Sequence, residues 1–270
     1  MTLGIMKQEL ESGAPYQFYH SPSLVKKWKE ITKKEAFVLY SPYIYCRKRL
    51  GISRSANAKG TIAFPAHSTV DIDDILDIEV YIKQLLMLPR EFQPISVCLY
   101  YSDIKKNQHK IFQKYNIPVY TAGYYFDERF AERLYNILKN FKYATSNVAG
   151  SYLYYAVEMG IPFSIFGQKQ KLFNKSDPNL DKGEFDPYKL SALHRKVHKM
   201  FSGLQTKITS EQKEFIEINL GLKDGVKPSQ LRHILFKALF KWLFSFRVFS
   251  LVAKLLRKLV KVSLLQKQQD

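Results

Sequence analysis

The stretch TSNVAGSYLYYAVEMGIPFSIFG, residues 145–167, combines the end of a strand, a helix and a second strand in one short segment. Gly150 and Ser151 stand before the apolar helical run, and Gly160 with Pro162 just beyond it is a typical helix stop. Two interpretations of Gly150 and Ser151 stay open. They are ordinary capping residues, or they let a phosphate approach the backbone at a helix N-terminus.

The same alternation of strand and helix extends toward the N-terminus. Short apolar runs are spaced by segments with helical periodicity, and this order predicts parallel strands joined by right-handed crossovers. We therefore expect an α/β fold with a Rossmann-like, doubly wound parallel sheet over residues 58–168. The expected strands lie in 60–68, 94–103, 117–123, 143–147 and 161–167, and the expected helices in 71–89, 104–116, 126–141 and 150–160.

Two details of this prediction concern particular residues. Asp71, Asp73 and Asp74 are expected in the first turn of the helix over 71–89, where the helix dipole favours acids. Cys98 lies in an apolar run, so we expect a buried free thiol.

The flanking regions have a different texture. Residues 1–57 form an N-terminal segment that is irregular up to residue 20, with a short helix at 21–34 and a strand-like run from 35. Residues 169–230 begin with a charged, turn-rich loop, expected to be exposed, and continue with two helices. Residues 231–270 are expected to form one basic amphipathic helix or two joined ones.

The charge balance favours an anionic partner. The chain has 42 Lys+Arg against 24 Asp+Glu, a formal net charge of +18. No zinc ligand set is visible, and no Asp-x-Asp follows a predicted strand, so we expect no metal and no resident cofactor. The first residues do not show the pattern of a secretory signal, so a cytoplasmic location is expected.

Ligands of open parallel sheets bind beyond the carboxyl ends of the strands. His67, at the end of the first predicted strand, is our first candidate for a catalytic base, and Asp103 is the second. A structural histidine and a helix-capping aspartate are the simpler alternatives. Candidate binding residues at the same edge are Ser68, Thr69, Tyr101, Thr121, Gly123, Ser146, Asn147, Gly150 and Ser151.

The segments KGTIAFPAHST, PISVCLYYSDIKK, VYTAG and SNVAGSYLYYAVEMGIP, taken in order, resemble the C-terminal half of GT-B glycosyltransferases, in particular bacterial surface-polysaccharide biosynthesis proteins. The resemblance covers about residues 40–225. It implies a nucleotide-sugar donor and a glycan or lipid-linked acceptor. It also implies that the loop at 67–69 and the start of the helix at 150–151 face the donor phosphates, with the loops at 101–103 and 121–123 near the base and ribose.

Two features depart from that family. Many retaining GT-B enzymes have a glutamate before an alanine in the last helix, which binds ribose; here Tyr155 precedes Ala156, and Glu158 is predicted on another face. A complete GT-B enzyme also has an N-terminal Rossmann-like domain, for which residues 1–57 are too few. The acceptor site and the usual catalytic base would then be missing, or come from a partner chain or a second copy.

The basic tail predicts attachment to a membrane surface. Leucines, phenylalanines and Trp242 interleave with lysines and arginines from Leu231 onward, and the uncharged stretches are too short to span a bilayer. Such a helix is typical of an interfacial anchor on anionic lipid. We expect a peripheral position on the inner face of the cytoplasmic membrane; a helix packed on the protein body is the alternative.

Two other functions are weighed against glycosyl transfer. A non-catalytic nucleotide-binding or scaffold subunit is the main alternative, because the N-terminal segment is short. Nucleic-acid binding rests only on the net charge. No nucleic-acid motif supports it, so no nucleic-acid partner is expected.

Overall fold

The computed structural model describes residues 5–68, 71–169, 171–177, 180–186, 192–244 and 251–255. The chain forms two compact units. One contains residues 41–220, and the other contains residues 2–40 and 221–270. The N-terminal segment of residues 1–57 is therefore divided between them.

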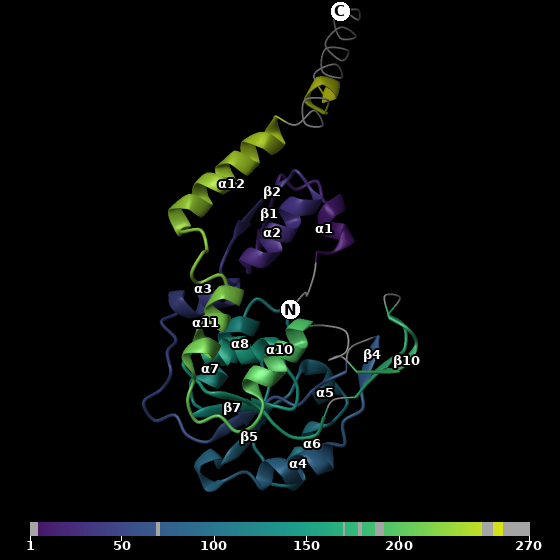
Figure 1. The fold of residues 1–270 in the computed structure, drawn as a ribbon, viewed down its shortest axis with the longest axis vertical. Helices are drawn as coiled ribbons and strands as arrows, with labels where there is room; N and C mark the ends of the chain where they lie inside the picture. Colours follow the sequence, from purple (N-terminus) through teal and green to yellow (C-terminus); the bar gives the residue numbers. More distant parts are fainter. Residues whose placement is uncertain are drawn as a thin grey trace, which may run out of the picture. The chain divides into compact units, whose positions relative to one another are not determined.

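The larger unit is built on a five-stranded sheet (Figure 1). Its order is β6-β5-β3-β7-β8, and every neighbouring pair is parallel. The chain starts in the middle at β3, moves outward to β6, and then returns to the other side of β3 with β7. This is a Rossmann-like, doubly wound arrangement, and the predicted fold class is confirmed at that level. The strands are β3 (Thr61–Ala63), β5 (Ile95–Cys98), β6 (Val119–Tyr120), β7 (Tyr143–Ser146) and β8 (Phe163–Ile165).

Helices cover both faces of this sheet. Helices α4 (Ile78–Leu86) and α6 (His109–Lys114) lie on one side, and α7 (Phe130–Leu138) and α8 (Ser151–Glu158) lie on the other (Figure 1). Tyr81, Ile82 and Leu85 of α4 are completely buried in one core cluster with strand residues. Burial of each such side chain stabilises the fold by about 1.5–3 kcal/mol. The other helices among the described residues of this unit are α3 (Pro42–Arg49), α5 (Tyr101–Lys105), α10 (Ala192–Phe201) and α11 (Ser210–Asn219), with a 3₁₀ turn at Arg90–Phe92.

The prediction of a helix from residue 71 is wrong for its first part. Ile72–Asp74 form strand β4, which pairs with β9 (Leu172–Asn174), and β9 pairs with β10 (Gly183–Phe185). The helix begins only after Asp77, whose carboxylate accepts a hydrogen bond from the Val80 backbone N–H at 3.1 Å. Asp71 and Asp73 instead accept bonds from Ser176 and Lys175 beside β9.

The expected exposed loop after residue 168 is therefore also wrong in part, because it supplies two of the three strands of this small antiparallel sheet. Asn174 organises its turn and is almost fully buried. The Asn174 amide donates to the backbone carbonyls of Asp177, Leu180 and Asp181 and accepts from the Asp177 N–H. One buried side chain thus holds the backbone of this turn together.

The smaller unit contains a parallel strand pair. Strands β1 (Tyr16–Tyr19) and β2 (Glu35–Val38) are joined through α2 (Pro22–Ile31), preceded by α1 (Lys7–Glu11). The expectation of an irregular chain before residue 20 is wrong, because β1 is a regular strand. Trp28 of α2 is fully buried, and its indole N–H donates to the Lys34 carbonyl at 2.8 Å.

Helix α12 (Pro228–Leu243) belongs to the same unit. Lys241 forms an ion pair with Glu35 at 3.0 Å and lies over the Tyr16 ring at 4.7 Å. Residues 251–255 are helical as well. The predicted tail helix is thus observed over these two pieces, and its other positions, 245–250 and 256–270, lie outside the described residues. Within the described ranges no helix combines the length and the apolar character needed to cross a bilayer.

Candidate functional site at the carboxyl edge of the sheet

The sheet changes winding direction between β3 and β7, where open α/β sheets bind ligands. The two strands are paired over Thr61–Ala63 and Tyr143–Thr145. Beyond the pairing, the Ala66 backbone N–H donates to the Asn147 side-chain oxygen at 2.9 Å. This bond ties the two loops together, so the residues that follow them share one edge of the sheet, as the sequence predicted.

His67 follows β3 and is half-buried. Its ring lies against the Tyr100 ring with a centroid distance of 4.8 Å and an interplanar angle of 30°. Tyr100 precedes α5, whose third residue is Asp103. The structure thus brings together the two residues predicted as catalytic.

Asp103 is almost fully buried, with 2% of its surface exposed. Its carboxylate accepts a hydrogen bond from the Tyr100 backbone N–H at 3.3 Å, so the simpler capping role holds too. Burial raises the pKa of the Asp103 carboxyl above its ordinary value, while the charge of nearby His67 and the Tyr100 N–H oppose that rise. The His67 Nδ1 lies 3.3 Å from the Ser68 backbone carbonyl, and a charged Asp103 carboxylate near the ring stabilises the protonated imidazole.

Tyr100 itself stays a neutral phenol. Burial raises its pKa, and the neighbouring Tyr125 and Tyr124 add to the shift. The sequence did not single out Tyr100, although it stands directly before the predicted Tyr101 and Asp103. Tyr101 is partly exposed, and the Lys105 ammonium lies over its ring at 4.7 Å.

The loop between β7 and α8 is filled by its own side chains. Ser146 is fully buried; its hydroxyl lies 2.8 Å from the Tyr152 hydroxyl and accepts from the Val148 N–H at 3.1 Å. Asn147 is almost fully buried, and its amide donates to the Gln168 carbonyl at 3.3 Å. Both predicted residues therefore shape the loop, whereas Ser151 is exposed and can be reached by a ligand.

Gly150 has an extended backbone, and a Cβ placed on it would collide with the Tyr152 ring. That ring stacks on Phe64 at 4.6 Å with an interplanar angle of 7°. The close approach that requires glycine here is made by a side chain of the protein.

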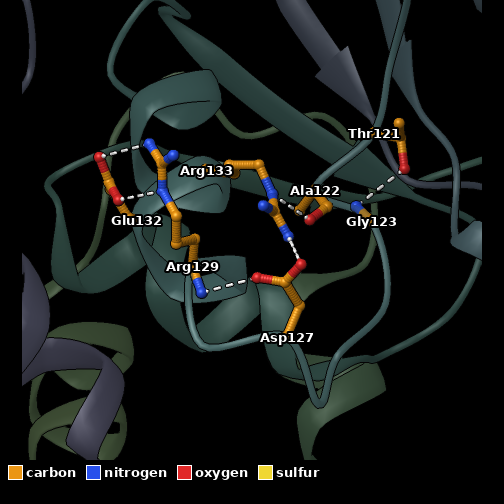
Figure 2. A network of polar contacts seen from close by, with 7 residues as sticks. All are labelled: Thr121, Ala122, Gly123, Asp127, Arg129, Glu132 and Arg133. Atoms are coloured by element: carbon orange, nitrogen blue, oxygen red, sulfur yellow. Dashed lines mark hydrogen bonds and ion pairs between the residues drawn. The ribbon is translucent and has the colours of Figure 1, made fainter.

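The loop between β6 and α7 is held at both ends, as Figure 2 shows. The Thr121 hydroxyl accepts from the Gly123 N–H at 3.0 Å. The Arg133 guanidinium donates to the Ala122 carbonyl at 2.7 Å and pairs with Asp127 at 3.0 Å. Gly123 has φ +86, and a Cβ there would meet the Arg133 side chain at 3.1 Å, so both conformation and space call for glycine.

Three consecutive aromatic residues stand between these anchors. Tyr124, Tyr125 and Phe126 are exposed by 45%, 49% and 70%. The Tyr125 ring lies 6.4 Å from Tyr100 and 4.0 Å from Phe126. Sequence reasoning missed these rings; the available signal was three large aromatics directly after a strand-end glycine.

Other predicted site features have definite surroundings. The Ser68 hydroxyl accepts from the Asp74 N–H at 3.1 Å, whereas Thr69 lies outside the described residues. Glu158 is paired with Arg47 through two hydrogen bonds and is nearly buried, so it is not placed for a ribose. Among the described residues, no cluster of three His, Cys, Asp or Glu side chains could hold a metal ion. Cys98 is a buried free thiol, as predicted, and burial raises its pKa to about 12.

Comparison of the sequence with protein-family models and with curated proteins finds no significant match. The fold and the geometry of the carboxyl edge therefore carry the functional argument.

Proposed function

We propose that the protein transfers a sugar from a nucleotide-activated donor to an acceptor hydroxyl, as a glycosyltransferase-like protein of bacterial surface-polysaccharide synthesis. The single observation that carries the proposal is the half-buried His67 beside the buried Asp103 at the switch point of the sheet. The sequence resemblance to the C-terminal half of GT-B enzymes supplies the reaction class.

In this proposal His67 is the general base. The acceptor oxygen attacks the anomeric carbon of the donor while its proton passes to the His67 imidazole. The bond between the anomeric carbon and the phosphate oxygen breaks, and its electron pair leaves with the nucleotide. Asp103 stabilises the imidazolium that forms, and general-base catalysis of this kind contributes about 10²–10⁴-fold to a rate.

The departing phosphate is assigned to the space between the loop of His67 and Ser68 and the start of α8. Exposed Ser151 opens that helix, and the positive end of the helix dipole stabilises a developing anion. Neutral donors and a helix terminus replace a metal ion in this proposal.

Helix α12 is assigned to the membrane surface. Leu235, Leu239 and Leu243 recur every four residues, and Phe236, Phe240 and Phe244 form the neighbouring row, all of them exposed. A broad apolar face on a helix from a strongly basic part of the chain suits an anionic bilayer surface. Lys241 of this helix is engaged with Glu35 and Tyr16, so the assignment does not depend on its charge.

The transfer reaction is tested by incubating the protein with a panel of UDP-, GDP-, CMP- and dTDP-sugars. Release of free nucleotide is followed with and without lipid extract as acceptor. We expect release from one donor class, increased by the extract. No release and no calorimetric binding of any donor would contradict the proposal.

The membrane assignment has its own assay. A variant with Phe236, Phe240 and Trp242 changed to serine should no longer float with phosphatidylglycerol vesicles, whereas the parent should. A variant with Tyr45→Ser, an exposed aromatic residue of α3, is the matched control. Equal flotation of all three proteins would contradict the assignment.

One observation favours a second function, a non-catalytic nucleotide-binding subunit. Ser146, Asn147 and Gly150 are already engaged inside the protein, so the β7–α8 loop offers a phosphate fewer donors than the sequence suggested. Binding of a nucleotide without release from any nucleotide sugar would favour this second function.

A further inference from the structure

The surface around Tyr124, Tyr125 and Phe126, here called the aromatic tip, is not explained by packing. These rings keep between 45% and 70% of their surface exposed, on a loop whose two ends are fixed by Arg133, Asp127 and Thr121 (Figure 2). Ordering three exposed aromatic side chains in water brings little gain from burial. A rigid loop that presents such rings is the arrangement expected of a stacking surface.

We propose that the aromatic tip binds the acceptor saccharide of the transfer reaction, a neutral glycan chain, by stacking its sugar rings. The inference rests on the proposed function and names its acceptor class. It goes beyond the prediction from the sequence, in which this loop contributed only Thr121 and Gly123 near the nucleotide.

The first argument is chemical. One face of a pyranose ring carries C–H groups with partial positive charge, and the face of an aromatic ring is electronegative. Tyr124 lies edge-on to Tyr125 and to Phe126 at 5.4 Å, and the Tyr125 and Phe126 rings lie 4.0 Å apart, so the three rings form one compact cluster. Each ring keeps at least 45% of its surface exposed, so the cluster offers aromatic faces to which the C–H face of a sugar can bind.

The second argument is electrostatic. Residues 124–133 contain three acids, Asp127, Glu128 and Glu132, and two arginines. Arg133 is paired with Asp127, and Arg129 with Glu132. A surface that collects a polyanion needs an excess of cations along the backbone path. Residues 124–133 have no such excess. Lys105 lies over the Tyr101 ring, which is 5.7 Å from Tyr124, but one cation does not make a path for a polyanion, so a neutral glycan fits the tip better than a nucleic acid.

The third argument is position. Tyr125 contacts Tyr100 at 6.4 Å, and Tyr100 contacts His67 at 4.8 Å. A sugar stacked on the tip would extend its hydroxyls toward the imidazole that accepts the proton. The aromatic tip would therefore bind the same acceptor glycan from which His67 takes the proton.

The test uses saturation-transfer difference NMR on the full chain. The probes are neutral tetrasaccharides of glucose, galactose, mannose and N-acetylglucosamine with α and β linkages, a pT8 oligonucleotide, and UDP and GDP. Four proteins are compared: the parent, the triple variant Tyr124→Ala, Tyr125→Ala, Phe126→Ala, the brace variant Asp127→Asn, and the control Tyr45→Ala.

We expect saturation of ring C–H protons of at least one tetrasaccharide in the parent and in Tyr45→Ala, and a signal at least fivefold weaker in the triple variant. The brace variant keeps the rings but frees one loop anchor, so its signal should be intermediate. Nucleotide binding should be equal in all four proteins.

Three results would overturn the inference: no tetrasaccharide signal in the parent, an unchanged signal in the triple variant, or pT8 binding lost with the rings. Loss of UDP or GDP binding in the triple variant would also overturn the inference, because the rings would then bind the nucleotide base rather than a sugar. A parent that binds a glycan but neither binds any of the UDP-, GDP-, CMP- and dTDP-sugars nor releases nucleotide from them would contradict the proposed function and leave the tip intact, so the two failures are distinguishable.

Discussion

Two loops at the same edge of the sheet differ in the orientation of their aromatic side chains: one loop turns its tyrosine ring inward, and the other exposes its rings. The β7–α8 loop turns Tyr152 inward, where its ring stacks on Phe64 and its hydroxyl meets Ser146. The β6–α7 loop turns Tyr124, Tyr125 and Phe126 outward and holds the chain beneath them with Arg133 and Asp127. Both loops contain a glycine close to the strand end, yet in each the glycine makes room for a side chain of the protein.

The difference teaches how far a glycine can be interpreted from sequence. A glycine at position 150, before a helix, is compatible with a phosphate site and with internal packing. Because both interpretations require the same residue, the sequence alone does not separate them. The structure shows the packing partner, Tyr152, two residues along the chain. The rings at 124–126 are the stronger indication of ligand binding, because each leaves a large part of its surface in water.

Changing Gly150 to valine should produce the largest effect on stability. Its Cβ would collide with the Tyr152 ring, which must then leave its stack on Phe64. Overpacking of this kind costs about 1–3 kcal/mol in the free energy of unfolding. Urea unfolding measures the loss, and Ser151→Val, at the exposed neighbour, is the control with a change within about 0.5 kcal/mol. A Gly150→Val protein as stable as the parent would contradict the claim that the Tyr152 ring requires glycine at position 150.

Changing Gly123 to alanine, in the β6–α7 loop, should lower the free energy of unfolding by less than Gly150→Val does. The positive φ of this residue strains any side chain by about 1–2 kcal/mol, and the Arg133 guanidinium must shift by a few tenths of an ångström. We expect a loss of about 1–2 kcal/mol in urea unfolding together with faster proteolysis at the tip. Gly160→Ala, with a positive φ but no neighbouring atom within 4 Å, separates backbone strain from the contact with Arg133. Equal loosening of the tip in both variants would contradict the role of Arg133 as a brace.

Asp103 supplies a prediction that depends on pH. Its pKa is raised in the folded protein by burial, against the opposing charges of His67 and Lys106. The folded state therefore binds this proton more tightly, and the contribution of Asp103 to stability declines as pH rises through the unfolded and then the folded pKa. An asparagine at this position cannot ionise but keeps an oxygen for the Tyr100 N–H.

The Asp103→Asn variant should accordingly gain stability relative to the parent as pH rises from about 4 to about 7. Urea unfolding at several pH values measures the difference, and Asp181→Asn, at an exposed carboxylate far along the chain, corrects for general charge effects. A difference that stays constant or shrinks with rising pH would argue against a buried carboxylate at this position.

The smallest effect is expected for Tyr152→Phe. The Ser146 hydroxyl and the Val148 carbonyl each lose one partner, but the Ser146 hydroxyl still accepts from the Val148 N–H, and the stack on Phe64 is kept. A loss of about 0.5–1.5 kcal/mol is expected in urea unfolding. A much larger loss would mean that the hydroxyl, rather than the ring, closes this loop.

Sequence reasoning succeeded where long patterns repeat. The five parallel strands and the neighbourhood of β3 and β7 follow from the alternation of apolar runs and helices, so His67 and Asp103 could be placed at one edge. It failed at β4, because DIDDI fits the period of a strand as well as the first turn of a helix, and the pairing partner β9 lies about 100 residues away. The aromatic tip was missed because sequence letters do not tell whether a tyrosine points inward, like Tyr152, or outward, like Tyr125.

The central claim is that His67, supported by Asp103, accepts the proton of the acceptor during sugar transfer. The most direct test is the rate of nucleotide release from the active donor class for the parent, His67→Ala, and His233→Ala as a control at an exposed histidine of α12. The account predicts a fall of about 10²–10⁴-fold for His67→Ala with donor binding retained, and an unchanged rate for the control. Equal rates for His67→Ala and the parent would contradict it.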